Sequence, residues 1–206
     1  NRLTHTHWTS EDEPTVLKGT AIYGYRYTYD DYGCHVKTEN IDKDGNLMYN
    51  RYGFCATITE YNEDGFEIKE TFIDDKGQAV SAQLGDNSFA IVVTKPNQWG
   101  QTLESCVFDE FNNPIENSAG YHKTVNEYDS IGNLTLTRYF DKAEKATKNG
   151  GFEHSTKLKF DEFNRLVEVS NYDENDKPTQ SSGGAATIKV EYTSSPKIPF
   201  QGTLPL

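Results

Sequence analysis

Apolar and polar residues alternate along several short stretches of this chain. In residues 54–59, Phe54, Ala56 and Ile58 alternate with smaller or polar side chains, and the alternation returns at 89–93 and 121–125. Such a period of two is typical of a β-strand with one face half-buried. Clusters of Asp, Asn and Gly separate the stretches, so the pattern predicts short strands connected by tight turns.

The stretches belong to an internal repeat. A Tyr-Asp-x-x-Gly motif and its variants occupy residues 29–33, 61–65, 96–100, 128–132 and 160–164, and their last positions are 32, 35, 32 and 32 residues apart. The longer step coincides with a polar insert around 84–87. Nine residues after each motif an aspartate follows an apolar or aromatic residue. These aspartates are Asp42, Asp74, Asp109, Asp141 and Asp173.

Both marks of the repeat have the chemistry of turns. An Asp or Asn side chain caps the backbone two residues on, and a Gly or Asn three positions later accepts a positive φ. The first motif therefore predicts a hairpin closed by a type I turn and a bulge. The second mark predicts a looser turn, which keeps its glycine at Gly45 and Gly77 and has Glu144 instead in the fourth unit.

The pattern predicts an all-β fold of tandem antiparallel β-hairpin repeats that form an elongated sheet or a solenoid. Residues 23–193 hold about five 32-residue units, residues 1–22 are a partial first repeat and linker, and residues 194–206 are a tail outside the repeat. Residue 1 lies one 32-residue period before Gly33, and residues 1–3 match residues 164–166. One unit cannot bury its own apolar face, so neighbours stabilise one another. We expect the chain to belong to a longer array.

The fourth unit resembles a known family. Residues 128–133 read Tyr-Asp-Ser-Ile-Gly-Asn and are followed by Tyr-Phe-Asp at 139–141. This is similar to the tyrosine-aspartate (YD, or Rhs-like) repeats of bacterial surface and secreted proteins, although the 32-residue period is longer than theirs. The resemblance covers about residues 23–193. It implies stacked β-hairpins that serve as an extracellular or cell-surface scaffold, an adhesion surface or a shell, and it implies no catalytic residues.

Composition and charge narrow the range of partners. The chain has 32 acidic and 20 basic residues, a net charge of −12, which disfavours nucleic acid and anionic membranes as partners. No apolar run approaches the roughly 18 residues of a membrane span, so we expect no membrane insertion. The 13 Tyr and 11 Phe suit half-buried sheets. Cys34, Cys55 and Cys106 form neither a disulfide framework nor a zinc pair.

One segment is a candidate ligand site. Tyr23, Tyr25, Tyr27 and Tyr29 alternate, which places four rings on one face of a strand. An aromatic strip of this kind stacks on sugar rings or on a quaternary ammonium group. Neighbouring strands are the alternative occupant, since cross-strand aromatic pairs stabilise sheets. The sequence leaves both interpretations open.

Other candidate sites have a structural explanation. Residues 40–51 resemble a calcium loop, but Arg51 occupies the position of the bidentate glutamate, and turn chemistry accounts for Asp42. His5 and His7 lack a third ligand nearby, and His122 and His154, 32 residues apart, are expected to stack in neighbouring units. No nucleophile, phosphate-binding or dinucleotide motif occurs. We therefore assign no catalytic, cofactor-binding or metal residue, and we expect a protein that is not an enzyme.

The sequence thus predicts a non-catalytic extracellular repeat module that acts as a scaffold or as an interaction or adhesion surface for protein or glycan. One alternative is a fragment of an Rhs-type shell that encloses a toxin. Another is an enzyme whose site is built on the insert near residues 80–95.

Overall fold

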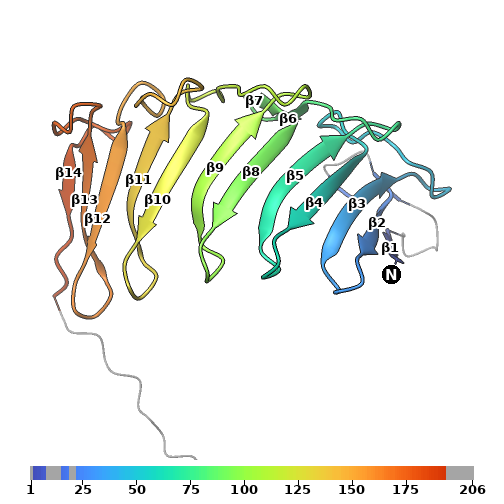
Figure 1. Cartoon of the computed structure of the whole chain (residues 1–206), viewed down its shortest axis with the longest axis horizontal. Coiled ribbons are helices and arrows are strands. Elements are labelled where there is room, and N and C mark those ends of the chain that lie inside the picture. Colours follow the sequence, from blue (N-terminus) through green and yellow to red (C-terminus); the bar gives the residue numbers. More distant parts are fainter. Residues whose placement is uncertain (1, 8–14, 19–21, 194–206) are drawn as a thin grey trace, which may run out of the picture.

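The computed structural model describes residues 2–7, 15–18 and 22–193, and these contain strands and no helix. Twelve strands form one open antiparallel sheet, in the order β1-β2-β3-β4-β5-β8-β9-β10-β11-β12-β13-β14 (Figure 1). Each strand of this sheet pairs with its neighbour in sequence, except that β5 pairs with β8 across the β6–β7 hairpin. The predicted all-β fold of tandem antiparallel hairpins is confirmed, and of its two forms the structure adopts the elongated sheet.

The strands are β1 (Arg2–Thr6), β2 (Gly24–Tyr29), β3 (His35–Ile41), β4 (Ala56–Tyr61), β5 (Glu67–Ile73), β6 (Ala82–Leu84), β7 (Asn87–Phe89), β8 (Ile91–Pro96), β9 (Thr102–Phe108), β10 (Lys123–Tyr128), β11 (Leu134–Phe140), β12 (Ser155–Phe160), β13 (Leu166–Tyr172) and β14 (Thr187–Lys189). Five long hairpins, from β2–β3 to β12–β13, point their turns toward the lower edge in Figure 1. The hairpins are joined along the upper edge.

The lower turns have the predicted chemistry. In the first, Asp30 Oδ1 accepts hydrogen bonds from the backbone N–H groups of Tyr32 (2.9 Å) and Cys34 (2.8 Å), and Gly33 has φ +87°. The pattern recurs in the other four hairpins, where Asn164 takes the place of glycine in the last at φ +62°. A register shift lies beside every turn. The predicted turn followed by a bulge is therefore confirmed.

The upper edge contains two turns per unit, of which the sequence pattern predicts one. The five predicted aspartates cap the first upper turn, and Asn112, Glu144 and Asp176 adopt positive φ there in place of glycine. The second upper turn opens eight residues after those aspartates, at Asn50, Asn117, Asn149 and Ser181. In the second unit the β6–β7 hairpin begins at this position, which accounts for the longer step.

Neighbouring hairpins pair only along their upper parts. Strands β4 and β5 of one hairpin pair at six positions, whereas β3 and β4 of adjacent hairpins pair at three, Lys37↔Ile58 to Glu39↔Ala56. The lower ends therefore diverge, and tyrosine hydroxyls bridge the gaps. Tyr61 Oη donates to the His35 carbonyl (2.8 Å). The equivalent bonds elsewhere in the array are Tyr128 to Thr102 (3.1 Å) and Tyr192 to Leu166 (3.0 Å).

The third hairpin bridges the same gap differently. It has Pro96 where its neighbours have tyrosine, and the Thr94 hydroxyl donates to the Glu67 carbonyl (2.8 Å) instead. In the fifth hairpin the corresponding residue is Phe160, which has no hydroxyl to donate. The lower parts of the strands are thus tied together by side chains where the backbone ladder has ended.

The first strand departs from the strict 32-residue frame by one residue. Thr38 pairs with Thr57 between the first two hairpins, so the frame predicts Thr6 opposite Tyr25. The structure pairs Tyr25 with His5 instead, and β1 is displaced by one position. Because side chains alternate between faces, this displacement moves His5 onto the face that carries Tyr25. The match of residues 1–3 to 164–166 therefore does not set the register of β1.

The buried residues gather at the upper ends of the strands, where consecutive residues such as Asn40 and Ile41, on opposite faces, are both buried. Ile41, Cys55, Ala56, Ala82 and Ala90 are at most 1% exposed. Further down, Thr57 and Ile58 point to opposite faces and are both half-buried, so the sheet is a single layer there. The elements of one unit cannot enclose a core, and its stability depends on the units beside it.

The lower-turn glycines provide a test of the turn geometry. Gly65 has φ +82° and open space where a Cβ would lie, whereas Gly183 is outside the positive-φ region and has only the Ser181 hydroxyl nearby. Gly65→Val is expected to lower the free energy of unfolding by about 1–3 kcal/mol through backbone strain. Gly183→Val, the matched control, should change it by less. Equal urea midpoints for the two variants would contradict the left-handed assignment.

The tyrosine bridges are testable by single-atom changes. Tyr61→Phe removes the hydrogen bond to the His35 carbonyl and should cost about 0.5–1.5 kcal/mol of stability. Tyr32→Phe, which removes a hydroxyl from a residue 93% exposed, is the control and should be neutral. Phe160→Tyr supplies the missing hydroxyl and should not destabilise the protein. Urea unfolding measures all three, and a neutral Tyr61→Phe would show that the bridges are dispensable.

Candidate interaction surface

The sheet has two chemically different faces. Alternation along the strands and the register between them place residues on one side or the other. The side that we call the neutral face carries Leu3, His5, Tyr25, Tyr27, Thr38, Asn40, Thr57, Thr59, Glu70, Phe72, Val92, Thr94, Ser105, Val107, Thr124, Asn126, Thr137, Tyr139, Thr156, Leu158, Val169, Asn171 and Ile188. The opposite side, the charged face, carries the lysines, arginines and remaining glutamates of the regularly paired strand segments.

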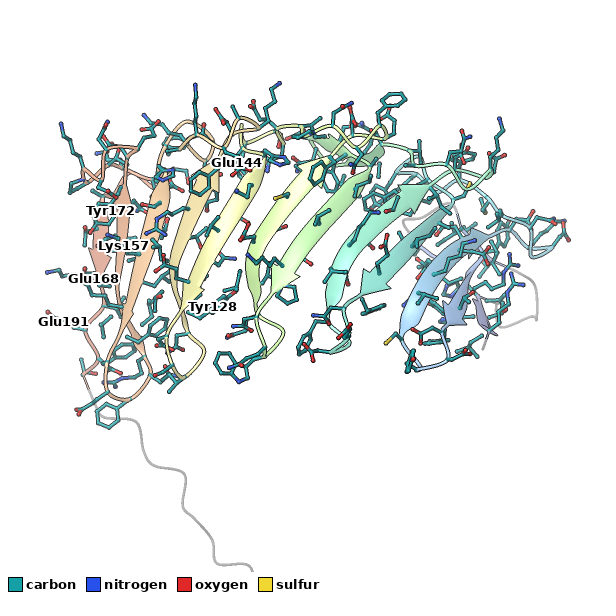
Figure 2. All side chains as sticks on the ribbon, viewed as in Figure 1. Tyr128, Glu144, Lys157, Glu168, Tyr172 and Glu191 are labelled. Carbon is teal, nitrogen blue, oxygen red and sulfur yellow. The ribbon has the colours of Figure 1, made fainter. Side chains whose placement is uncertain are left out.

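The charged face is crossed by ion pairs, one in each of four consecutive hairpins. They are Lys69–Glu60 (2.9 Å), Lys95–Glu104 (3.0 Å), Arg138–Glu127 (2.5 Å) and Lys159–Glu168 (2.7 Å). Figure 2 labels Glu168 together with Lys157 and Tyr172; the Lys157 ammonium group lies 4.6 Å from the centroid of the Tyr172 ring. Exposed pairs of this kind each contribute about 0–1 kcal/mol, so this face is a solvated one.

Glu39 forms the densest ionic cluster among the described residues. Its carboxylate is 8% exposed and contacts Arg26 (2.6 Å), Arg2 (3.0 Å) and Lys37 (3.0 Å). The three cations come from the three strands β1, β2 and β3. Because a buried charge is costly unless it is paired, the cluster holds the first strand to the array and has a structural role.

Glu70 is the one charged residue of the neutral face, counted over the described strand residues that pair in regular register. Burial raises the pKa of its carboxyl above the ordinary value, and the negative charge of Glu67 adds to this. The rest of the face consists of Thr, Ser, Asn, His, aromatic and aliphatic side chains, most of them half-buried.

The predicted aromatic strip lies on this neutral face. Tyr25, Tyr27 and Tyr29 are in β2, and Tyr23 immediately precedes it; all four are half-buried. The rings of Tyr25 and Tyr27 are stacked with centroids 6.1 Å apart. Burial raises the pKa of both hydroxyls. Neighbouring strands flank the strip and do not cover it completely, so both interpretations from the sequence retain support.

Histidines extend the strip in a way that the sequence did not predict. The His35 ring lies 5.3 Å from that of Tyr27, and the His7 ring lies 6.5 Å from that of Tyr25 and 4.9 Å from that of His5. The result is an aromatic band across β1, β2 and β3. Only the displaced register of β1 brings its two histidines to this side, which is why sequence spacing did not reveal the band.

The other sequence candidates have structural roles. Asp42 caps its upper turn by accepting the N–H groups of Asp44 and Asn46. His122 and His154 are buried, and each places Nδ1 within hydrogen-bond distance of a carbonyl of the upper loop, at 3.1 Å from Ile115 and 3.0 Å from Thr147 respectively. Within the described residues no three His, Cys, Asp or Glu side chains gather as metal ligands.

Neither the insert nor the cysteines bring several reactive or ligand-binding groups together in the described part of the chain. The insert forms the β6–β7 hairpin, and Asn87 Oδ1 accepts hydrogen bonds from the N–H and hydroxyl of Ser118 (2.9 Å each). All three cysteines are free thiols. Burial, with smaller effects of Asp75 and Asp74, raises the pKa of Cys55 to about 11, which leaves it protonated and unreactive at neutral pH.

A feature that the sequence pattern did not predict lies at the hairpin turns. The third residue of each lower turn is exposed, and in four of the five hairpins it is large and apolar. We call these four the tip row: Tyr32 (93% exposed), Trp99 (67%), Ile131 (72%) and Phe163 (44%). The second hairpin has Asp64 there. The sequence signal was available as an apolar residue two positions after the turn-opening Asp or Asn in four of the five lower turns.

Comparison with family models and with curated proteins identifies no relative. No protein-family model matches the chain, and no curated protein matches it. The described residues contain no helix that is long and apolar enough to cross a membrane. The likeness to YD repeats therefore stays a prediction, and a functional proposal depends on the geometry of the sheet.

The turn aspartates predict a dependence of stability on pH. The pKa values of Asp42, Asp109, Asp129, Asp161 and Asp173 are lowered from an ordinary 3.8. For Asp42 and Asp173 the largest cause is the backbone N–H four residues on. For the other three it is the side chain of the residue at that position, Asn113, Asn133 or Arg165.

A carboxyl with a lowered folded-state pKa stabilises the protein above its unfolded pKa, and that stability is lost as the pH falls through the folded value. We expect urea midpoints that are constant from pH 7 to about 5 and fall progressively below about 4. Asp129→Asn keeps an acceptor without a charge and should reduce the slope. A midpoint that stays constant down to pH 2 would contradict this assignment.

Proposed function

We propose that the protein is a non-catalytic extracellular repeat module whose sheet acts as an interaction or adhesion scaffold for protein or glycan. The observation that carries the proposal is the neutral face. A quarter of all residues are charged, yet this face has a single carboxylate in the regularly paired, described strand segments. Exposed surfaces of soluble proteins are normally mixed in charge, so an extended uncharged face is typical of a surface that is covered by a partner.

The chemistry of the neutral face suits binding. Covering a charged side chain costs several kcal/mol unless it is paired, whereas Thr, Ser and Asn exchange water for ligand hydrogen bonds at little cost. The stacked rings of Tyr25 and Tyr27 add a platform for apolar contact. Thr57, Thr124 and Thr156 repeat on different hairpins and offer the same groups to a long or repetitive partner.

A catalytic role has less support because the polar groups that repeat are engaged in turns. The aspartates of the lower and upper turns accept backbone N–H groups, as Asp30 and Asp74 do, and this role recurs in every unit. A catalytic constellation is expected to break a repeat. The extracellular setting is supported by the resemblance to YD repeats.

The shell fragment is the second candidate. The open, twisted sheet in Figure 1, with one neutral and one charged face, suits the wall of an enclosure whose inner side contacts a polypeptide. In that case the neutral face would bind unfolded protein segments and no glycan. The two functions therefore differ in their ligand and share the same surface.

Lysine substitutions on opposite faces test the proposal. The protein is applied to a glycan array and to immobilised purified proteins, folded and unfolded. Thr57→Lys with Thr124→Lys charges the neutral face and should weaken any binding at least tenfold. Thr71→Lys with Thr187→Lys adds the same two charges on the opposite face and should leave binding within twofold. Equal loss in both variants, or no saturable binding to either set, would contradict the proposal.

A further inference from the structure

The residue that follows each lower turn reaches across to the next hairpin, except in the first hairpin. In chain order these residues are Cys34, Phe66, Gln101, Asn133 and Arg165. The Phe66 ring packs so closely on Gly100 that a Cβ there would lie 2.7 Å away, and Gln101 Nε2 donates to the Gly132 carbonyl (2.8 Å). Asn133 Nδ2 donates to Asn164 Oδ1 in the next gap. Cys34 has the smallest side chain of the five, and a cleft of about 770 Å³ lies at its gap, between the first two turns.

The fifth hairpin shows which group such a gap accommodates. Arg165 Nε and Nη2 each lie 2.7 Å from Asp161 Oδ2. The guanidinium carbon of Arg165 lies 4.2 Å from the centroid of the Tyr192 ring and 5.1 Å from that of Phe163. The guanidinium group therefore donates to a carboxylate while it stacks on aromatic rings, which is the combination of contacts that arginine favours.

The first cleft has the same partners in the same places of the repeat. They are Asp30 for Asp161, Tyr32 for Phe163 and Tyr61 for Tyr192, and all three line the cleft. Asp30 and Asp161 each accept the backbone N–H groups two and four residues on. Tyr61 and Tyr192 each donate a hydroxyl hydrogen bond to a carbonyl of the preceding hairpin. The cleft thus has the carboxylate and the rings of an arginine site, with Cys34 in place of the arginine.

We propose that this cleft binds an arginine side chain of a partner polypeptide, which lies between Asp30, Tyr32 and Tyr61 as Arg165 lies in the fifth hairpin. The cleft is at the lower edge in Figure 1, between the turns of the β2–β3 and β4–β5 hairpins. The inference rests on the proposed role in protein interaction, and it adds a second place on the molecule and the chemistry of the partner.

The charge of the cleft favours a cation. Its lining includes four carboxylates, Asp30, Glu60, Glu63 and Asp64, and no Lys or Arg. Glu60 is paired with Lys69 (2.9 Å), whereas no ion pair among the described residues involves the other three. An incoming guanidinium group therefore enters a region of excess negative charge, and an anionic partner is repelled from it.

The walls and the size of the cleft suit a residue within a polypeptide. Val36 and Cys34 are half-buried in its lining and offer apolar surface to the methylene groups of an arginine. The cleft is larger than one arginine side chain, so the residues that flank the arginine have room to enter it. Arginine is also among the residues that contribute most to protein interfaces, because one side chain combines charge, stacking and hydrogen bonding.

The site is tested with a capped Gly-Ser-Arg-Ser-Gly peptide, titrated into the full chain while backbone amide shifts are followed by NMR. We expect saturable shifts at Tyr32, Cys34 and Gly65, and none at Asn164, where Arg165 already occupies the gap. The citrulline peptide keeps the planar shape without the charge and should bind about tenfold more weakly. The lysine peptide should also bind more weakly, because its ammonium group neither stacks nor donates in a plane.

Two variants act on the cleft itself. Asp30→Asn removes the charge and keeps the cap, since Asn62 and Asn97 cap the next two turns, and it should weaken peptide binding about tenfold. Asp129→Asn is the same change in the fourth hairpin and should leave binding within about twofold. Cys34→Arg supplies the arginine from the chain and should abolish peptide binding without lowering the urea midpoint.

Butylguanidine separates the two sources of a guanidinium group and should bind more weakly than the peptide. Binding of butylguanidine as tight as that of the peptide would indicate a small-molecule site and overturn the inference. So would the absence of saturable shifts with the arginine peptide, equal binding of the citrulline peptide, or unchanged binding in Cys34→Arg. The proposed function is separable: if Thr57→Lys with Thr124→Lys abolishes binding to a protein or glycan and the arginine peptide does not bind, the neutral face is the interaction surface and the cleft is not.

Discussion

The structure depends on one local constraint, the turn that opens with a capping Asp or Asn and closes with a residue at positive φ. At Asp30–Gly33 the carboxylate accepts two backbone N–H groups and Gly33 adopts φ +87°, which reverses the chain with a bulge. The turn fixes the register of its hairpin, and register fixes which side chains share a face. The division into a charged and a neutral face is thus a consequence of turn chemistry repeated in five hairpins.

A single-layer sheet has little core, so its stability must come from many small contacts distributed along the array. Buried residues such as Ile41, Cys55 and Ala90 lie at the upper ends of the strands. Below them, cross-strand ion pairs occupy one face, and tyrosine hydroxyls connect hairpins whose ladders have ended. Each contribution is modest, and each recurs along the array. The same arrangement leaves both faces and the lower edge accessible, which is what an interaction scaffold requires.

The sequence predicted the elements that depend on local chemistry. The lower turns, the first upper turns and the strands between them were located because Asp, Asn and Gly at fixed spacing have one favourable backbone geometry. The second upper turn was missed, since its Asn-x-x-Gly mark is complete only at 50–53 and 117–120 and the insert replaces it in the second unit. The tip row was also missed, because turn chemistry specifies the capping residue and the positive-φ residue and leaves the exposed side chain between them unconstrained.

By itself, then, the sequence determined the all-β fold, the 32-residue period and the antiparallel hairpins. Tertiary structure alone decided how hairpins join one another: the short three-residue pairing between them, the one-residue displacement of β1, and the aromatic band that unites His7 with Tyr25. The physical reason is that a turn constrains residues close in the chain, whereas pairing between hairpins depends on side chains well separated along it. Those contacts become defined only when the strands lie side by side.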